Sequence, residues 1–102
     1  MDKIAMLTDI LAQNPNDAFA RYGLAMEHAN RGESDAALEQ FGQLTTAHPD
    51  YTAGYQMAAQ LLMKMGRQQE AEQTLKAGVS AAQRTGNNLA LNEMSAMLDE
   101  LS

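Results

Sequence analysis

Residues 18–51 read AFARYGLAMEHANRGESDAALEQFGQLTTAHPDY, and residues 52–85 read TAGYQMAAQLLMKMGRQQEAEQTLKAGVSAAQRT. The two segments have the same length and share residues at matching positions. Large apolar residues recur at the same step of 34 residues, from Leu7 to Phe41 to Leu75. Identical residues at this step include Pro15 and Pro49, Ala25 and Ala59, Gly32 and Gly66, and Ala37 and Ala71. A fixed step of this length indicates an internal repeat whose unit is one supersecondary element.

Each segment is predicted to fold as two helices joined by a turn at its glycine. In the first segment Asp17 is a candidate N-cap, and Ser34 can cap the second helix. Between them, Gly32 can adopt the left-handed conformation that closes a helix. Pro49 follows the second helix and cannot continue it. With the two ends of the chain included, the expected helices cover residues 2–13, 18–30, 35–47, 52–65, 68–84 and 88–101.

The two terminal segments are each predicted to form one helix that covers an end of the repeats. The N-terminal helix corresponds, at the 34-residue step, to the second helix of a repeat, and its apolar stripe contains Ile4, Leu7, Ile10 and Leu11. The C-terminal helix has Asn87 or Asn88 as its cap, and its apolar seam contains Leu91, Met94, Leu98 and Leu101. The expected organisation is one domain over residues 1–102, with a half repeat at 1–14, repeats at 18–51 and 52–85, and a capping helix at 87–102.

This pattern resembles the tetratricopeptide repeat, a 34-residue helix–turn–helix unit. The residues that carry the resemblance are Leu24, Ala25, Gly32, Ala37, Phe41 and Pro49 in the first unit, and Tyr55, Ala58, Ala59, Leu62, Gly66, Ala71 and Leu75 in the second. Three positions depart from the family's pattern. Arg21 replaces a bulky aromatic residue, His28 replaces a tyrosine, and Gln83 replaces the closing proline. The departures leave the spacing unchanged, and the resemblance covers nearly the whole chain.

The resemblance implies an all-α fold in which about six helices form a right-handed superhelix. It also implies a scaffold or adaptor for protein–protein interaction, which holds a peptide or a partner helix in a concave groove. The resemblance implies no catalytic residues, no metal and no cofactor. The chain is therefore expected to be a binding protein and not an enzyme.

The groove in such a fold is lined by one face of the first helix of each repeat. Helical projection places Ala20, Leu24, Ala25 and His28 on the side of the hairpin core, with Tyr55, Ala58 and Leu62 on the core side of the second repeat. The opposite face gives the predicted groove residues, which are Phe19, Tyr22, Met26, Asn30, Gln56, Gln60, Met63 and Lys64. Methionine adapts to varied apolar ligands, and glutamine amides hydrogen-bond an extended backbone.

A stripe of aromatic and methionine side chains at helical spacing also fits internal packing. It can pack on the protein's own N-terminal or C-terminal helix, or on a second copy of the chain. The second interpretation of the sequence is therefore a homo-oligomerisation module, with a homodimer that buries this surface or the C-terminal seam.

Charge and composition exclude several classes of function. Thirteen acidic and seven basic residues give a formal net charge of −6, and the basic residues are scattered singly. Nucleic-acid and anionic-lipid binders need clustered basic residues, so neither nucleic acid nor membrane is an expected partner. The chain has no cysteine, which fits a reducing compartment and a cytoplasmic location. It also lacks a phosphate-binding glycine loop and an HExxH motif.

The two histidines are not at metal-binding spacing. His28 is expected to occupy the interhelical position at which the family prefers tyrosine, with a local hydrogen bond. His48 precedes Pro49 and is expected to be a solvated turn residue.

Overall fold

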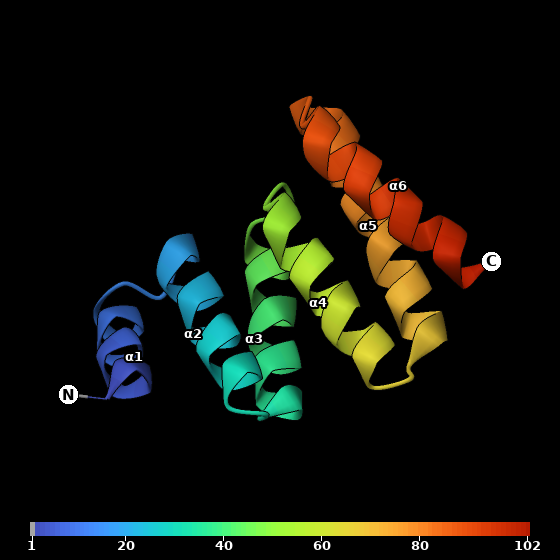
Figure 1. The fold of residues 1–102 in the computed structure, drawn as a ribbon. Coiled ribbons are helices and arrows are strands. Elements are labelled where there is room, and N and C mark those ends of the chain that lie inside the picture. Colours follow the sequence, from blue (N-terminus) through green and yellow to red (C-terminus); the bar gives the residue numbers. More distant parts are fainter. Residues whose placement is uncertain (1) are drawn as a thin grey trace. The chain divides into compact units, whose positions relative to one another are not determined.

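The computed structural model describes residues 2–102, which form six α-helices (Figure 1). Their bounds are α1 Lys3–Gln13, α2 Ala18–Asn30, α3 Ser34–Ala47, α4 Thr52–Lys64, α5 Gln68–Thr85 and α6 Asn88–Leu101. The all-α class is confirmed, and every helix begins and ends within one residue of its predicted bounds.

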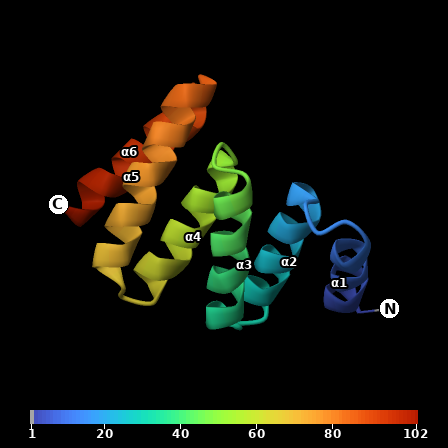
Figure 2. The ribbon, with the colours of Figure 1, turned by 180° about the vertical axis from the view of Figure 1, so that it is seen from behind.

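The helices belong to two compact units, one that ends at His48 and one that begins at Pro49. In the first unit α2 packs between α1 and α3, and in the second α5 packs along both α4 and α6. Figures 1 and 2 show these pairings from opposite sides, with α6 lying along α5 in both views.

Two helices begin at side-chain caps, as predicted. The Asp17 carboxylate accepts a hydrogen bond from the Ala20 amide at 2.9 Å. The side-chain oxygen of Asn87 accepts one from the Ala90 amide at 3.1 Å, which identifies Asn87 and not Asn88 as the cap of α6. The prediction for Ser34 is wrong, because this residue is already the first residue of α3 and Glu33 precedes it without a side-chain cap.

The turns within the two repeats close in the same way. Gly32 and Gly66 have φ angles of 76° and 78°, in the left-handed region that a side chain would disfavour. The next amide then reaches back across the turn, from Glu33 to the His28 carbonyl at 2.9 Å and from Arg67 to the Leu62 carbonyl at 2.9 Å. This six-to-one bond satisfies a carbonyl at the end of the preceding helix.

The first unit has its core on both sides of α2. On one side Leu11 of α1 packs with Ala20 and Leu24, and Ile4 and Leu7 lie against them. On the other side, the buried apolar residues of the α2–α3 hairpin are Ala25, Ala37, Phe41 and Leu44. Ala25 and Ala37 are fully buried, as close approach of the two helices requires. Ile10 was predicted to lie on the apolar stripe of α1 but is 40% exposed, because Ile4 and Leu7, and not Ile10, are the residues that pack against α2 in the first unit.

The core of the second unit lies where three helices meet. Its buried residues are Ala59, Leu75, Ala82, Ala90 and Met94. Gly78 of α5 lies where α4 and α6 both come close to α5. A Cβ added at Gly78 would be 2.5 Å from Met94 Sδ and 2.8 Å from Tyr55 Cβ. The absent side chain thus gives α4 and α6 room to pack on the same turn of α5.

The loop before α4 is attached to the second unit through one carbonyl. The Pro49 oxygen accepts hydrogen bonds from the Tyr55 hydroxyl at 2.8 Å and from Arg84 Nη2 at 3.1 Å. Arg84 Nε also donates to Asp50 at 3.0 Å. The end of α5 and the first turns of α4 therefore hold the loop together.

Candidate partner-binding surfaces

The face of α2 that was predicted to line a groove is partly exposed. Phe19 is 79% exposed, which is the largest exposure of any large apolar side chain among residues 2–102. Tyr22, Met26 and Asn30 follow it at three- and four-residue steps and so share its side of the helix. Met26 is half-buried and Asn30 is exposed. The opposite side of α2 is buried, as predicted for Ala20, Leu24 and Ala25.

Tyr22 also contributes to packing within the first unit. Its ring meets the buried Phe41 ring of α3 edge to face, with centroids 6.2 Å apart and planes at 63°. Part of the aromatic stripe therefore packs on α3, which was not among the helices expected to cover it. Phe19 differs from Tyr22 because most of its surface faces solvent.

Arg21 joins the two helices of the first repeat, at the position where the family's pattern has a bulky aromatic residue. Its Nη1 donates to the side-chain oxygens of Gln40 and Gln43, each at 2.7 Å. Its Nη2 donates to the Pro15 carbonyl at 3.2 Å. A guanidinium has enough donors to serve three acceptors at once, so this arginine replaces apolar packing with a polar link.

In the second unit the predicted groove residues of α4 are more polar. Gln56 is half-buried, and its amide nitrogen donates to Glu93 of α6 at 2.6 Å. Gln60 and Lys64 are exposed, and Met63 is half-buried. Sequence reasoning missed Glu93, which extends this face of the second unit onto α6.

The start of α6 repeats the start of α2. Both helices have a side-chain cap, Asp17 or Asn87, followed two residues later by an exposed apolar side chain. That side chain is Phe19 in α2 and Leu89, 70% exposed, in α6. The buried residues also correspond, Ala20 to Ala90 and Leu24 to Met94. In this pattern α6 resembles the first helix of a repeat.

A family model described as tetratricopeptide repeat matches residues 28–91 of this sequence. The chain belongs to the tetratricopeptide repeat family. Proteins of this family are generally modules for protein–protein interaction and are typically non-catalytic. The resemblance that was drawn from the 34-residue step is confirmed.

Similar proteins come from several organisms. A TPR repeat-containing protein of Pseudomonas aeruginosa is 26% identical over 95 residues, which cover 93% of this chain and 90% of that protein. The solution structure of a tetratricopeptide repeat domain protein from Salinibacter ruber has a TM-score of 0.81 and 29% identity, covering 87% of this chain and 90% of that one. The TPR2B domain of yeast Sti1, solved in a complex with pHsp70, has a TM-score of 0.87 at 16% identity and covers 96% of this chain and 78% of that one.

The histidines of this tetratricopeptide repeat protein have structural partners. His28 Nδ1 lies 3.0 Å from Glu33 Oε1, which confirms the local hydrogen bond expected at this position. His48 Nε2 lies 3.0 Å from the Asn16 carbonyl, so the expectation of a merely solvated turn residue is wrong. The bond attaches the end of α3 to the loop before α2. Over residues 2–102, no three His, Cys, Asp or Glu side chains are placed to hold a metal ion.

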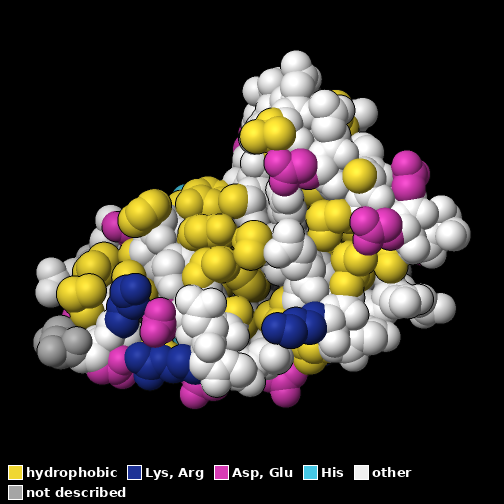
Figure 3. All heavy atoms as spheres, viewed as in Figure 1, with side chains coloured by type: hydrophobic (Ala, Val, Ile, Leu, Met, Phe, Trp, Pro, Cys, Tyr) yellow, Lys and Arg dark blue, Asp and Glu magenta, His cyan; other side chains and the backbone are white. Residues whose placement is uncertain are grey.

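Charged side chains on the repeats pair locally. The Arg31 guanidinium contacts the Asp2 carboxylate and holds the pKa of that carboxyl below its usual value. Arg67 does the same to the pKa of Glu70, which accepts a hydrogen bond from its Nη2 at 2.8 Å. On the face shown in Figure 3, basic side chains occur singly or beside acidic ones, with apolar side chains between them. This distribution does not resemble a phosphate-binding stripe.

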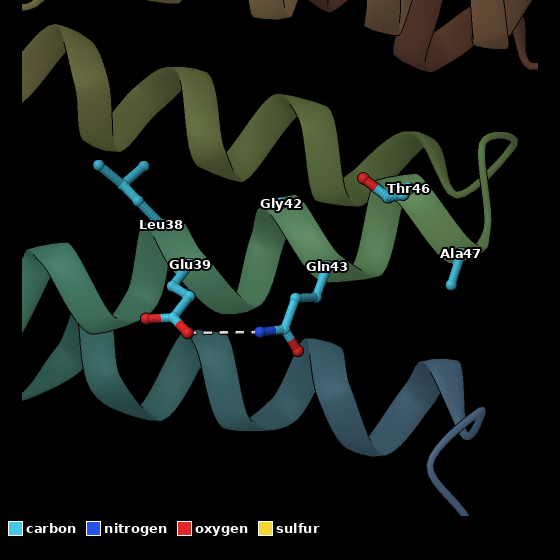
Figure 4. A pocket seen from close by; sticks show the side chains of 6 residues that line it. All are labelled: Leu38, Glu39, Gly42, Gln43, Thr46 and Ala47. Atoms are coloured by element: carbon cyan, nitrogen blue, oxygen red, sulfur yellow. Dashed lines mark hydrogen bonds between the residues drawn. The ribbon is translucent and has the colours of Figure 1, made fainter.

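A shallow hollow of about 440 Å³ lies along one side of α3. It is centred on Gly42, and Figure 4 shows the side chains around it, which belong to Leu38, Glu39, Gln43, Thr46 and Ala47. Gln43 donates to Glu39 at 3.4 Å along its edge. A Cβ added to Gly42 would meet nothing within 4 Å. The hollow is therefore a notch in an exposed helix and not an enclosed site.

The helices were also compared with the length and apolarity that a membrane span requires. Over residues 2–102, none of them meets both requirements.

Proposed function

We propose that this tetratricopeptide repeat protein is an adaptor that binds an apolar peptide segment or partner helix on the exposed face of α2. The observation that carries the proposal is Phe19, a large aromatic side chain that is 79% exposed on a well-formed helix. Met26 lies on the same face, where its flexible thioether can adapt to a ligand. Burial of these side chains against a partner removes apolar surface from water, which favours binding.

The predicted groove residues of α4 form a separate, more polar face of the second unit, and we propose that this face suits polar parts of a partner. Gln60 and Lys64 are exposed there, and the hydrogen bond to Glu93 orients the Gln56 amide. Amide groups both donate and accept, so they suit the backbone of an extended peptide. Lys64 adds a positive charge for a carboxylate of the partner.

The Sti1 domain supports a protein as the class of partner. It has the same fold, and it was solved in a complex with pHsp70.

Capture of partners from the native cell extract tests the proposal. Immobilised wild-type protein is compared with Phe19→Ala and Met26→Glu, and bound proteins are identified by mass spectrometry. Both variants should lose the same partner while keeping wild-type helicity and melting temperature. For that partner, Phe19→Ala should weaken the affinity about 30-fold, as truncation of a central aromatic contact does.

Met65→Ala provides the matched control, since Met65 is exposed at the end of α4 and lies outside the predicted groove residues. It should capture the partner as the wild type does. Unchanged capture by both folded α2 variants would show that this face is not the site. If a second copy covers the face instead, sedimentation will show a wild-type dimer that Phe19→Ala converts to monomer.

A further inference from the structure

Within the second unit, α4 and α6 are joined by a hydrogen bond between their side chains. Both helices pack on α5, and they also contact each other (Figure 1). Gln56 Nε2 of α4 donates to Glu93 Oε2 of α6 at 2.6 Å. Gln56 is half-buried, whereas Glu93 is exposed. The bond therefore restrains a carboxylate that faces solvent beside the line where the two helices meet.

Glu93 has no cationic partner within the chain. Its hydrogen-bond donor is a neutral amide, which orients the carboxylate but leaves its negative charge in place. Over residues 2–102, the carboxylates that contact a basic side chain are those of Asp2, Glu27, Glu33, Asp50, Glu70 and Glu72. A carboxylate that is oriented without being neutralised is suited to a cation from outside the chain.

Two kinds of acceptor remain at this hydrogen bond. A carboxylate has about four lone-pair sites, and the Gln56 amide uses one of those on Glu93. The amide group of Gln56 also has a carbonyl oxygen next to the nitrogen that donates. A guanidinium presents parallel N–H donors in a rigid fork, which suits neighbouring oxygen acceptors better than a single point charge does.

Apolar side chains lie on either side of Glu93 along α6. Leu89 is one turn before it and 70% exposed, and Ala96 is three residues after it and also exposed. The aliphatic stems of long basic side chains pack on apolar surface while their charged ends stay in water. Leu89 in addition offers a contact for an apolar residue of the ligand.

We propose that the Gln56–Glu93 pair binds an arginine side chain of a basic, partly apolar peptide segment. The inference rests on the proposed function and deepens it, because it names the ligand chemistry of the α4 face. Lys64 is the only basic residue of α4 and α6. It lies about two turns, or about 12 Å, beyond Gln56 along α4, which exceeds the screening length of about 8 Å at physiological salt. Lys64 therefore leaves the charge of Glu93 available.

Two matched peptides test the requirement for charge. The probe is the peptide Ala-Leu-Ala-Arg-Ala, blocked at both ends. In the comparison peptide, citrulline replaces arginine and provides a side chain of nearly the same shape without the charge. NMR titration follows the side-chain amide signals of Gln56. The arginine peptide should bind the wild type about tenfold more tightly than the citrulline peptide, as a hydrogen bond between charged groups predicts.

Glu93→Gln removes the charge and keeps a side chain that can hydrogen-bond Gln56. This variant should retain wild-type helicity and lose the preference for the arginine peptide. Asp9→Asn is the matched control, because it makes the same change of net charge at an exposed position of α1, in the other unit. It should keep the tenfold preference.

Equal binding of the two peptides to the wild type would overturn the inference, and so would a preference that survives Glu93→Gln. An equal loss in Asp9→Asn would also overturn it, because attraction would then follow net charge alone. The capture experiments on α2 are decided separately. A preference for arginine without partner capture through Phe19 contradicts only the proposed site on α2, whereas capture without the preference overturns only this inference.

Discussion

Gly78 and Gly42 are both helical glycines, yet their surroundings differ. Gly78 faces Met94 and Tyr55 at distances shorter than a methyl group tolerates. Gly42 faces open space on α3. A glycine within a helix costs about 0.5–1 kcal/mol relative to alanine, so each position is explained only by its neighbours. At Gly78 the close packing of three helices justifies that cost, whereas nothing in the structure explains Gly42.

Substitution by alanine should therefore act in opposite directions at the two sites. Gly78→Ala should lower the free energy of unfolding by about 1–3 kcal/mol, because the new methyl group overpacks the core of the second unit. Gly42→Ala should raise it by about 0.5–1 kcal/mol through helix propensity alone. Urea unfolding followed by circular dichroism measures both. A stabilised Gly78→Ala protein would mean that Met94 moves aside without cost.

Single residues differ in how far they can be predicted from sequence. Asp17 and Gly32 have roles that depend on local backbone geometry, and both are correctly predicted. The contact of Tyr22 with Phe41 and the three hydrogen bonds of Arg21 depend on how α3 is rotated against α2. A rotation of that kind is decided by side-chain packing across the hairpin, which a repeat pattern does not contain.

Among the helices, α1 is attached to α2 by charge as well as by its apolar stripe. Arg31 at the end of α2 contacts Asp2 before α1 and Glu27 one turn earlier. The hydrogen bond from Arg31 is the largest cause of the lowered pKa of Asp2. A carboxyl whose pKa is lowered in the folded state stabilises that state above its unfolded pKa, and the contribution disappears as pH falls through the lowered value.

Arg31→Ala should return the pKa of Asp2 toward its ordinary value, as measured by NMR titration of the side-chain carboxyl. It should also speed amide hydrogen exchange in α1 at neutral pH, and high salt should reduce the difference because the pair is exposed. Arg67→Ala is the control, since it should raise the pKa of Glu70 and leave Asp2 unchanged. An Asp2 titration that is the same in Arg31→Ala and wild type would contradict the role of this pair.

The helix boundaries follow closely from the sequence because breakers and caps lie between all the periodic segments. The position of α6 in the repeat pattern is harder to predict from the sequence. Its start lies 70 residues after that of α2, two more than two repeats require, because α5 continues to Thr85. Because of this shift, a comparison of the sequence at the 34-residue step does not align Asn87 with Asp17. For the same reason it does not indicate that Glu93 contacts Gln56. Sequence reasoning therefore describes α6 as a cap, and the structure adds that it resembles the first helix of a repeat.

At the level of the whole molecule, the net charge determines which charged partners the protein attracts or repels at long range. Thirteen acidic residues against seven basic ones repel polyanions, and local pairing occupies several of the basic side chains. A long-range field of this sign speeds encounters with cationic proteins and slows those with nucleic acids.

The protein should accordingly leave the fluorescence anisotropy of labelled duplex DNA unchanged at about 0.15 M salt. A saturable rise in anisotropy that weakens with added salt would contradict this expectation. A basic peptide and an acidic peptide of equal length serve as reference ligands. Association with the basic peptide should be the faster of the two, and the gap should close as salt is raised.

The notch at Gly42 has a practical consequence for such measurements. The chain contains no cysteine, so Gly42→Cys would introduce its single thiol. At this position the new side chain contacts no neighbour and points into solvent. A maleimide dye attached there would report on binding near α3 without replacing a packed side chain. The missing side chain thus makes α3 a ready attachment point for a spectroscopic label.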